Sequence, residues 1–274
     1  MVLAITNQKG GVGKTTTVLN IGVFLAVKGK KVLLVDIDPQ ANLTSGLGVQ
    51  DSTIVEEANG EADRKTVYDV LVNKEDIKTI IRPTRITNLD MLPSGIELAG
   101  AEVELVNAIS RENILKKAID SIKDNYDFVI IDCPPSLGLL TINGLVATDQ
   151  IIIPVQSEYF ALEGLGQLMN TITLVRSNLN YNLDIGGVVL TMFDNRTNLS
   201  KDVTNEIKKF FEDKVFETII PRNVKLSEAP SRGLSIYEYA PQSAGSQAYE
   251  KLADEIIKRF DKNRLVRPNL TRTT

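Results

Sequence analysis

The stretch "ITNQKGGVGKTTT", residues 5–17, largely determines how this chain is interpreted. It nearly matches the phosphate-binding loop pattern G-x-x-x-x-G-K-[ST]. Gly13, Lys14 and Thr15 supply the end of the pattern, but Gln8 stands where its first glycine belongs. An additional lysine, Lys9, follows directly. The loop therefore lacks a glycine and has a second cation at its start.

The flanking residues place this loop between a strand and a helix. Residues 2–6 are apolar and β-branched, which is typical of a buried strand. After Thr15, apolar residues recur at helical spacing, at Val18, Ile21 and Leu25. Strand, glycine-rich loop and helix together are the context in which such a loop binds phosphate.

The loop residues have the chemistry that phosphate binding needs. Gly10, Gly11 and Gly13 allow backbone N–H groups to converge on a phosphate at the positive end of the helix. Lys14 is expected to reach the β- and γ-phosphates, and the Thr15 hydroxyl to ligate Mg²⁺. The alternative is a plain strand-to-helix turn with a solvated lysine.

Two acidic segments are candidate partners for a metal ion. In "KKVLLVDIDPQ", Asp36 and Asp38 end an apolar strand, and both would face one site if that strand continued to Asp38. In "YDFVIIDCPPS", Asp132 follows an apolar strand that two prolines end. Carboxyl ends of strands are where open α/β sheets bind ligands. The alternative is that these aspartates only form turns.

Lys9 has no role in an ordinary phosphate loop. A second positive group near a transferring phosphate can accelerate hydrolysis greatly. Because Lys9 precedes the glycines, it could point away from its own nucleotide. We therefore hypothesise that it serves the nucleotide of a second copy in a face-to-face dimer.

Six ordered motifs resemble the ParA/Soj family of chromosome-partitioning ATPases, from about residue 1 to about residue 258. That family belongs to the deviant Walker A class, together with MinD and the nitrogenase iron protein. The motifs are "KGGVGKTTT", "VLLVDIDPQANLTSGLG", "FVIIDCPPSLGLLTINGL", "IIPVQSEYFALEGL", "LTMFDNRTNL" and "IPRNVKLSEAPSRG".

The resemblance implies a site for ATP or ADP with Mg²⁺. Lys9 would be the signature lysine that reaches across an ATP-sandwich homodimer, and Asp38 would position the attacking water. The implied catalytic residues are Lys9, Lys14 and Asp38, and the implied metal-binding residues are Thr15, Asp38 and, through water, Asp132. The implied nucleotide-binding residues are Lys9, Gly10, Gly11, Val12, Gly13, Lys14, Thr15 and Thr16, with Pro221, Arg222 and Asn223 bordering the adenine.

The resemblance also implies macromolecular partners. Arg196 and Lys225 match family positions where basic residues contact non-specific double-stranded DNA, although the family often has arginine at the second position. A ParB-type centromere-binding protein would stimulate hydrolysis. The alternative for both residues is that they are ordinary solvated surface cations.

The remaining chain predicts a single α/β domain with the P-loop NTPase fold. Its apolar runs at 31–36, 128–132, 150–155 and 184–191 alternate with helical patterns, which indicates a mostly parallel, twisted sheet with helices on both faces. We expect the ATPase domain to span residues 1–262. Residues 50–66 are polar and acidic and predict an exposed loop; residues 263–274 predict a flexible basic tail.

Composition narrows the class of protein. Cys133 is the only cysteine, so it cannot form an intrachain disulfide, and its position favours a small buried hydrophobe over a functional thiol. A single cysteine also argues against the nitrogenase iron protein, which holds its cluster with two per subunit. The chain has no histidine. We expect a cytoplasmic, nucleoid-associated protein with no signal peptide and no membrane span.

The charge is unevenly distributed. The whole chain has a net charge of −4, whereas residues 251–274 hold seven Lys or Arg against three Asp or Glu. The rest is therefore more acidic than the total suggests. A basic tail can be merely solvated, or it can help to hold a polyanion.

Three functions fit the motifs. The first is an ATP-hydrolysing switch for segregation, in which the ATP-bound dimer binds DNA and hydrolysis releases it. The second is a MinD-like membrane-cycling ATPase, which would need a C-terminal amphipathic helix that the stretch "EIIKRFDKNRLVRPNLTRTT" does not continue. The third is a metabolic enzyme that transfers phosphate to a small molecule, which leaves Lys9 without a role. Because no operator-binding domain precedes the loop, we do not expect a sequence-specific repressor.

Overall fold

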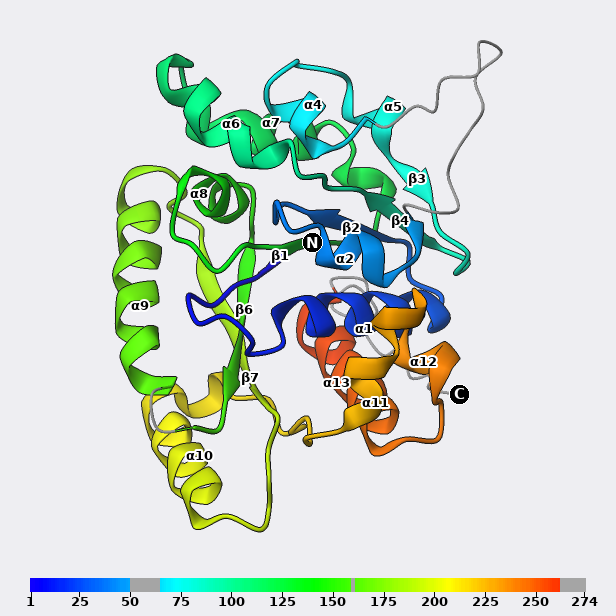
Figure 1. Cartoon of the computed structure of the whole chain (residues 1–274). Coiled ribbons are helices and arrows are strands. Elements are labelled where there is room, and N and C mark those ends of the chain that lie inside the picture. The colour runs from blue at the N-terminus through cyan, green and yellow to red at the C-terminus, as the bar shows by residue number, and fades with distance from the viewer. Residues whose placement is uncertain (50–64, 159–160, 262–274) are drawn as a thin grey trace, which may run out of the picture.

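A seven-stranded sheet forms the centre of the computed structural model, which describes residues 1–49, 65–158 and 161–261 (Figure 1). The strand order is β3-β4-β2-β5-β1-β6-β7, and every neighbouring pair is parallel except β3 with β4. The strands are β1 (Val2–Ile5), β2 (Val32–Asp36), β3 (Arg82–Pro83), β4 (Leu89–Leu92), β5 (Phe128–Asp132), β6 (Gln150–Gln156) and β7 (Asp184–Thr191).

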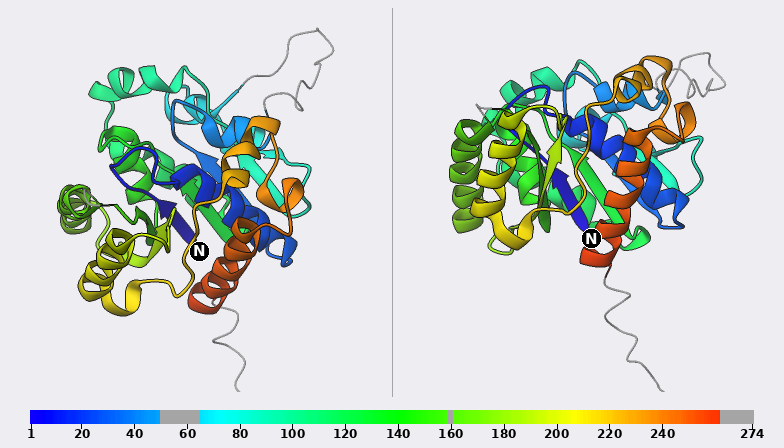
Figure 2. Two further views of the ribbon diagram at one scale, coloured as in Figure 1. Left: turned by 60° about the horizontal axis from the view of Figure 1, so that its bottom comes forward. Right: turned by 90° about the horizontal axis from the view of Figure 1, so that it is seen from below.

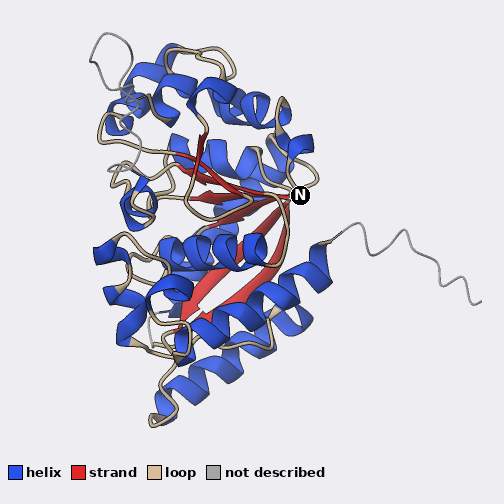
Figure 3. Ribbon diagram, turned by 90° about the vertical axis from the view of Figure 1, so that its right-hand side faces the viewer, coloured by secondary structure: helices blue, strands red, loops and turns tan. Residues whose placement is uncertain are grey.

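Helices cover both faces of this sheet, as Figure 3 shows from the side. They are α1 (Lys14–Val27), α2 (Asn42–Gly46), α4 (Val67–Leu71), α5 (Ile77–Ile80), α6 (Leu98–Glu104), α7 (Ile114–Asp120), α8 (Leu139–Val146), α9 (Ala161–Asn178), α10 (Asn198–Phe211), α11 (Val224–Glu228), α12 (Ile236–Tyr239) and α13 (Ala244–Phe260). Short 3₁₀ turns join several of them.

The alternation of side chains along each strand supplies two separate cores. Leu3 and Ile5 of β1 point into the core that contains α1 and α13. Val2 and Ala4 point the other way, into the core that α8 and α9 cover. Strands buried on both faces read as continuous apolar runs, which is why these segments were recognisable in the sequence.

The structure confirms the predicted fold class and the strands that the sequence indicated. Two strands at one edge of the sheet were missed. β4 has only four residues, including an aspartate, and β3 has two, including a proline. Neither is long enough to show a strand period. The predicted loop over 50–66 lies outside the described residues except for its last two positions, and the predicted tail over 263–274 lies wholly outside them.

Helix α13 closes the fold by packing against α1, the helix that follows the phosphate loop (Figure 2). Tyr249 of α13 is almost fully buried, and its hydroxyl lies 3.0 Å from the hydroxyl of Thr17 on α1. A buried hydroxyl that loses its partner costs free energy, because it has left water without a replacement bond. This contact therefore ties the end of the described chain to the first turn after the loop.

We predict that Tyr249→Phe lowers the melting temperature by about 2–4 °C, since the buried Thr17 hydroxyl loses its partner at a cost of about 1 kcal/mol. The measurement is thermal unfolding followed by circular dichroism. Thr17→Val provides the matched control, because the double variant should lose less than the two single losses added together. Strictly additive losses would contradict the hydroxyl pair.

Candidate functional site

The loop between β1 and α1 needs glycine at two positions. Gly11 has φ of 74° and Gly13 has φ of 87°, a region that residues with a Cβ avoid. Neither Gln8 nor Lys9 takes a positive φ. The loop therefore does not depend on the missing first glycine for its backbone conformation. Gly13 also precedes the first turn of α1 directly, so the loop ends at the positive pole of a helix.

Two hydrogen bonds attach this loop to neighbouring strands, and a third lies within it. The Thr191 hydroxyl, at the end of β7, donates to the carbonyl of Val12 at 2.8 Å. The Asn7 amide donates to the carbonyl of Pro154 in β6 at 2.7 Å, and its oxygen accepts from the backbone N–H of Lys9 at 3.0 Å. Sequence reasoning missed Asn7 and Thr191, because their partners come from distant strands.

Lys14 begins α1 and is buried within the loop. Its Nζ donates to the carbonyl of Lys9 at 3.3 Å. Burial lowers the pKa of Lys14, while the nearby charges of Asp132 and Asp38 oppose that change. The structure thus brings Lys14 and both predicted acidic residues together around one point at the carboxyl edge of the sheet.

Asp132 is a buried carboxylate at the end of the strand beside β2. It ends β5 and is 1% exposed, and neither carboxylate oxygen has a hydrogen-bond partner among the described residues. Burial raises the pKa of Asp132 well above its usual range, the charge of Asp36 adds to this, and the nearby Thr15 side chain opposes it. A buried carboxylate without a partner is costly unless a positive group joins it.

These residues fit a Mg²⁺ ion that is shared with phosphate and water better than a metal ion that is bound by protein side chains alone. The described residues contain no group of three or more His, Cys, Asp or Glu that could hold a metal by themselves. Mg²⁺ commonly keeps several waters and binds one or two carboxylates together with substrate phosphates. Thr15 and Asp132 beside a phosphate loop are a donor set of that kind.

Asp36 has a structural role that its position in the motif did not reveal. β2 ends at Asp36, so Asp38 lies beyond the strand and the two do not share a face by strand alternation. Asp36 accepts from the Thr44 hydroxyl at 2.7 Å and from the backbone N–H groups of Thr44 and Asp38 at 3.0 and 3.1 Å. Burial raises the pKa of Asp36 to about 6, although the bonds from Thr44 oppose this.

Asp38 is held by its backbone rather than by its carboxylate. Its carbonyl accepts from the Ser94 hydroxyl at 2.8 Å, and Ser94 N–H donates to Thr44. One carboxylate oxygen of Asp38 accepts from the backbone N–H of Gln40 at 2.9 Å. The side chain therefore keeps acceptor capacity, and its charge acts on Lys14, which suits a group that orients a ligand or a water.

Lys9 is engaged within its own chain. Its Nζ lies 3.1 Å from Oε2 of Glu158, just after β6, and the other carboxylate oxygen of Glu158 lies 3.9 Å from Nη2 of Arg222. Pro221 forms a bridge with Phe193 beside β7. Glu158 thus connects the phosphate loop to the predicted adenine-bordering segment, and no local pattern in the sequence indicates this connection.

The rest of that segment begins a helix. Asn223 precedes α11, and its side-chain oxygen accepts from the backbone N–H of Lys225 at 2.9 Å. Asn223 therefore caps a helix in this structure, whereas the resemblance assigned it to the adenine. The two roles are compatible because they use different atoms: capping occupies the amide oxygen of Asn223, and its amide nitrogen stays available for the adenine.

The two predicted DNA-contacting cations are exposed, and each has a carboxylate partner. Arg196 is 81% exposed in its side chain and binds Asp194 at 2.6 Å. Hydrogen bonds from Arg196 hold the pKa of Asp194 well below its usual range. Lys225 lies 2.8 Å from Glu228 and over the ring of Tyr239. A phosphate backbone would have to compete with both carboxylates.

Cys133 is fully buried in the core, as predicted for a small hydrophobe. Burial raises the pKa of its thiol, which makes a reactive thiolate unfavourable. Within the residues that the structure describes, no helix has the length and apolar character to cross a membrane.

Comparison with known proteins agrees with this geometry. Residues 1–185 match a family model described as an AAA domain. The chain is 57% identical to sporulation initiation inhibitor protein Soj of Bacillus subtilis, over 93% of this chain and 97% of that one. It is 53% identical to the chromosome-partitioning ATPase Soj of Treponema pallidum, over 94% and 97% of the two chains.

A solved structure shares the architecture. The crystal structure of cobyrinic acid a,c-diamide synthase from Mycobacterium smegmatis with bound ADP and magnesium superimposes with a TM-score of 0.79 at 37% identity, over 96% of each chain. The phosphate loop with its additional lysine, the acidic strand ends and these similarities agree, and the chain belongs to the Soj/ParA family of chromosome-partitioning ATPases, within the deviant Walker A class.

Proposed function

We propose that this protein is an ATP-hydrolysing switch for chromosome or plasmid segregation. In this proposal ATP binding produces a homodimer, the dimer binds double-stranded DNA without sequence preference, and hydrolysis releases it. The observation that carries the proposal is the pair of lysines in one loop: Lys14 is buried beside Asp132 and Asp38, whereas Lys9 is partly exposed and pairs with Glu158.

The bound nucleotide would lie along the loop, with its phosphates at the N-terminus of α1. Gly10, Gly11 and Gly13 would present backbone N–H groups, and Lys14 would neutralise the β- and γ-phosphates. When present, Mg²⁺ would neutralise the developing phosphate charge, held by Thr15 and, through water, by Asp132. The unpartnered oxygens of Asp132 support this assignment.

Asp38 is the residue that we assign to the attacking water. Its carboxylate has only the Gln40 N–H as a hydrogen-bond donor among the described residues, and its charge reaches Lys14. A carboxylate with free acceptor capacity beside the phosphates can orient a water for in-line attack. Asp36 cannot do this, because Thr44 and the Asp38 backbone already occupy both of its oxygens.

Lys9 would complete the site of a second copy. Exposed ion pairs contribute only about 0.2–1 kcal/mol to stability. Lys9 could therefore leave Glu158 at little cost and bind a phosphate of the nucleotide held by the second copy. Transfer of the lysine to the partner site couples hydrolysis to dimer formation, since neither copy then has a complete site alone.

The alternatives fit less well. A MinD-like membrane cycle requires a C-terminal amphipathic helix with an apolar face that is free for lipid, but α13, the last helix of the described residues, buries its apolar residues against the domain. A metabolic phosphotransferase leaves Lys9 without a role. The two Soj proteins also have higher identity to this chain than the diamide synthase structure does. We expect a ParB-type protein to stimulate hydrolysis, as the resemblance implies.

Asp38→Ala should bind ATP but hydrolyse it roughly 10²-fold or more slowly, because the carboxylate that orients water is lost while the phosphate contacts stay. The protein should then accumulate as an ATP-bound dimer. Size-exclusion chromatography and phosphate release provide the measurements. Lys14→Ala is the control, since it should lose ATP binding itself; an Asp38→Ala protein that stays monomeric with ATP would count against the proposal.

Lys9→Ala should retain ATP binding and lose hydrolysis, and mixing it with Lys14→Ala should restore part of the activity. In the mixed dimer, the Lys9→Ala chain has an intact Lys14 site and receives Lys9 from its partner. Provided that mixed dimers form with one bound nucleotide, random pairing of equal amounts would restore at most about a quarter of the wild-type rate, since half the dimers would have one working site. Phosphate release from the mixture is measured; normal turnover by Lys9→Ala alone would disprove the role in trans.

Arg196→Glu should abolish ATP-dependent DNA binding while dimerisation and basal hydrolysis continue. Binding strength grows steeply with the number of phosphates neutralised, and a dimer presents each cation twice. The measurement is DNA retention across a salt series with ATP. Arg176→Glu is a matched control, because Arg176 also pairs with an aspartate but at the opposite end of β7. Equal loss in both variants, or in neither, would place the DNA surface elsewhere.

A further inference from the structure

Helix α6 and the turn after it are apolar on two faces. The inner face, Leu98, Ala101 and Leu105, is buried in the core. The outer apolar face of α6 consists of Val103 on the helix, Ile96 just before it, Val106 in the 3₁₀ turn Leu105–Asn107 and Ile109 just after that turn, which are 75%, 71%, 54% and 95% exposed. Because the inner face already packs on the core, these exposed apolar residues on and beside α6 are expected to have a second partner.

This concentration is unusual within the described chain. Eleven large apolar residues are exposed there, and four of them lie in the fourteen residues from Ile96 to Ile109. Single exposed apolar residues need no explanation, whereas a contiguous group commonly marks an interaction site. The outer apolar face of α6 is therefore the strongest candidate for a docking surface outside the nucleotide site.

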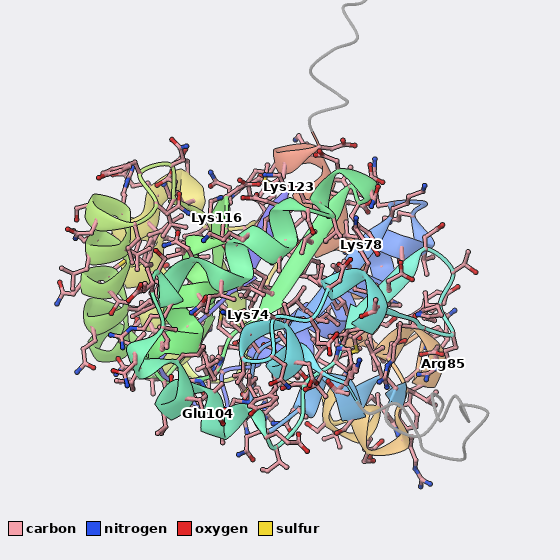
Figure 4. All side chains as sticks on the ribbon, turned by 90° about the horizontal axis from the view of Figure 1, so that it is seen from above. Lys74, Lys78, Arg85, Glu104, Lys116 and Lys123 are labelled. Carbon is pink, nitrogen blue, oxygen red and sulfur yellow. The ribbon has the colours of Figure 1, made fainter. Side chains whose placement is uncertain are left out.

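The charge around this face selects the kind of occupant. The segment from Ile96 to Glu112 holds four glutamates and one arginine, a local charge of −3. The arginine, Arg111, is itself paired with Glu112. In Figure 4, Glu104 lies on α6 at the edge of the molecule, whereas the labelled lysines come from other segments: Lys74 from the turn after α4, Lys78 from α5, Lys116 from α7 and Lys123 from the turn after α7. A cationic segment with an apolar side matches both features.

A symmetric contact with a second copy of the chain does not match the negative charge around the outer apolar face of α6. Two-fold symmetry places the same patch of each subunit against the other. The outer face of α6 would then bring its carboxylates against their own copies, which is unfavourable for like charges. The charge thus favours a partner of opposite sign.

α6 is also connected to the nucleotide site. One oxygen of Glu102 accepts from the backbone N–H of Leu140, at the start of α8, at 3.3 Å. It also occupies the space that a side chain at Gly138 would need. The loop that these contacts hold begins directly after Asp132. A ligand on α6 that shifts Glu102 would therefore act on the loop that follows a predicted metal residue.

We propose that the outer apolar face of α6 is the docking surface for a positively charged amphipathic segment of a partner protein. The surrounding glutamates select its charge, and Ile96, Val103, Val106 and Ile109 take its apolar side. This proposal rests on the proposed function in one respect, the partner that stimulates hydrolysis. The outer apolar face of α6 would be the surface through which that partner acts on the ATPase site.

The first test uses two synthetic amphipathic helices, each with leucines on one side and either lysines or glutamates on the other. The lysine peptide should bind the wild-type protein in fluorescence anisotropy, and the glutamate peptide should not. Val103→Asp should weaken that binding by ~10-fold or more, because a charge then lies in the apolar contact. Glu97→Lys should weaken it as well.

Phe210→Asp is the matched control, because Phe210 is 66% exposed and lies on α10, far from α6 in Figure 1. It should leave peptide affinity unchanged. The proposal is overturned if the lysine peptide fails to bind, if it binds Val103→Asp as well as wild type, or if both peptides bind equally. It is also overturned if Val103→Asp loses ATP-dependent dimerisation, since a second copy would then be the occupant.

The second test separates this inference from the proposed function. A ParB-type protein from the same organism should stimulate phosphate release by wild type and by Phe210→Asp but not by Val103→Asp, while basal rates stay equal. Stimulation of all three would overturn the docking surface and leave the proposed function intact. Failure to stimulate wild type would contradict the partner named under the proposed function, and the peptide measurements would still decide the surface.

Discussion

Two carboxylates lie side by side inside the protein, and the arrangement of the site follows from their need for partners. Asp36 and Asp132 end the neighbouring strands β2 and β5 and occupy paired positions in the register. Both are almost completely buried. Because buried like charges are unfavourable in a medium of low polarity, each needs donors or a cation close by. The fold meets this need in two different ways.

Asp36 is satisfied by the protein itself. Three hydrogen bonds from Thr44 and Asp38 occupy its oxygens and hold the turn that follows β2. Through Ser94 the same network reaches the backbone of Asp38. The backbone of the water-positioning candidate is therefore fixed while its carboxylate keeps free acceptor capacity. Asp132, in contrast, has two carboxylate oxygens without a hydrogen-bond partner among the described residues, and the Thr15 side chain and the charge of Lys14 both act to lower its pKa.

The two lysines of the loop also differ in their surroundings. Lys14 is buried and its charge is balanced by the carboxylates inside the site. Lys9 is partly exposed and its partner, Glu158, comes from a loop at the surface. A charge inside a closed site is held firmly, whereas an exposed pair exchanges readily with another anion. Under the proposed function, one loop would thus present a firmly held cation, Lys14, to its own nucleotide and an exchangeable one, Lys9, to the nucleotide of a second copy.

The sequence by itself determined the fold class, the phosphate loop and the acidic strand ends. Local signals sufficed there, since glycines with positive φ, helical spacing after Thr15 and apolar strands that end in aspartate are all contiguous in the chain. Only the tertiary structure decided which groups share a partner. Thr191 with Val12, Thr17 with Tyr249 and Lys9 with Glu158 are each separated by well over a hundred residues. Such pairs leave no periodic trace in a single sequence, because the order of the strands in the sheet and the packing of α13 on α1, and not the chain order, bring them together.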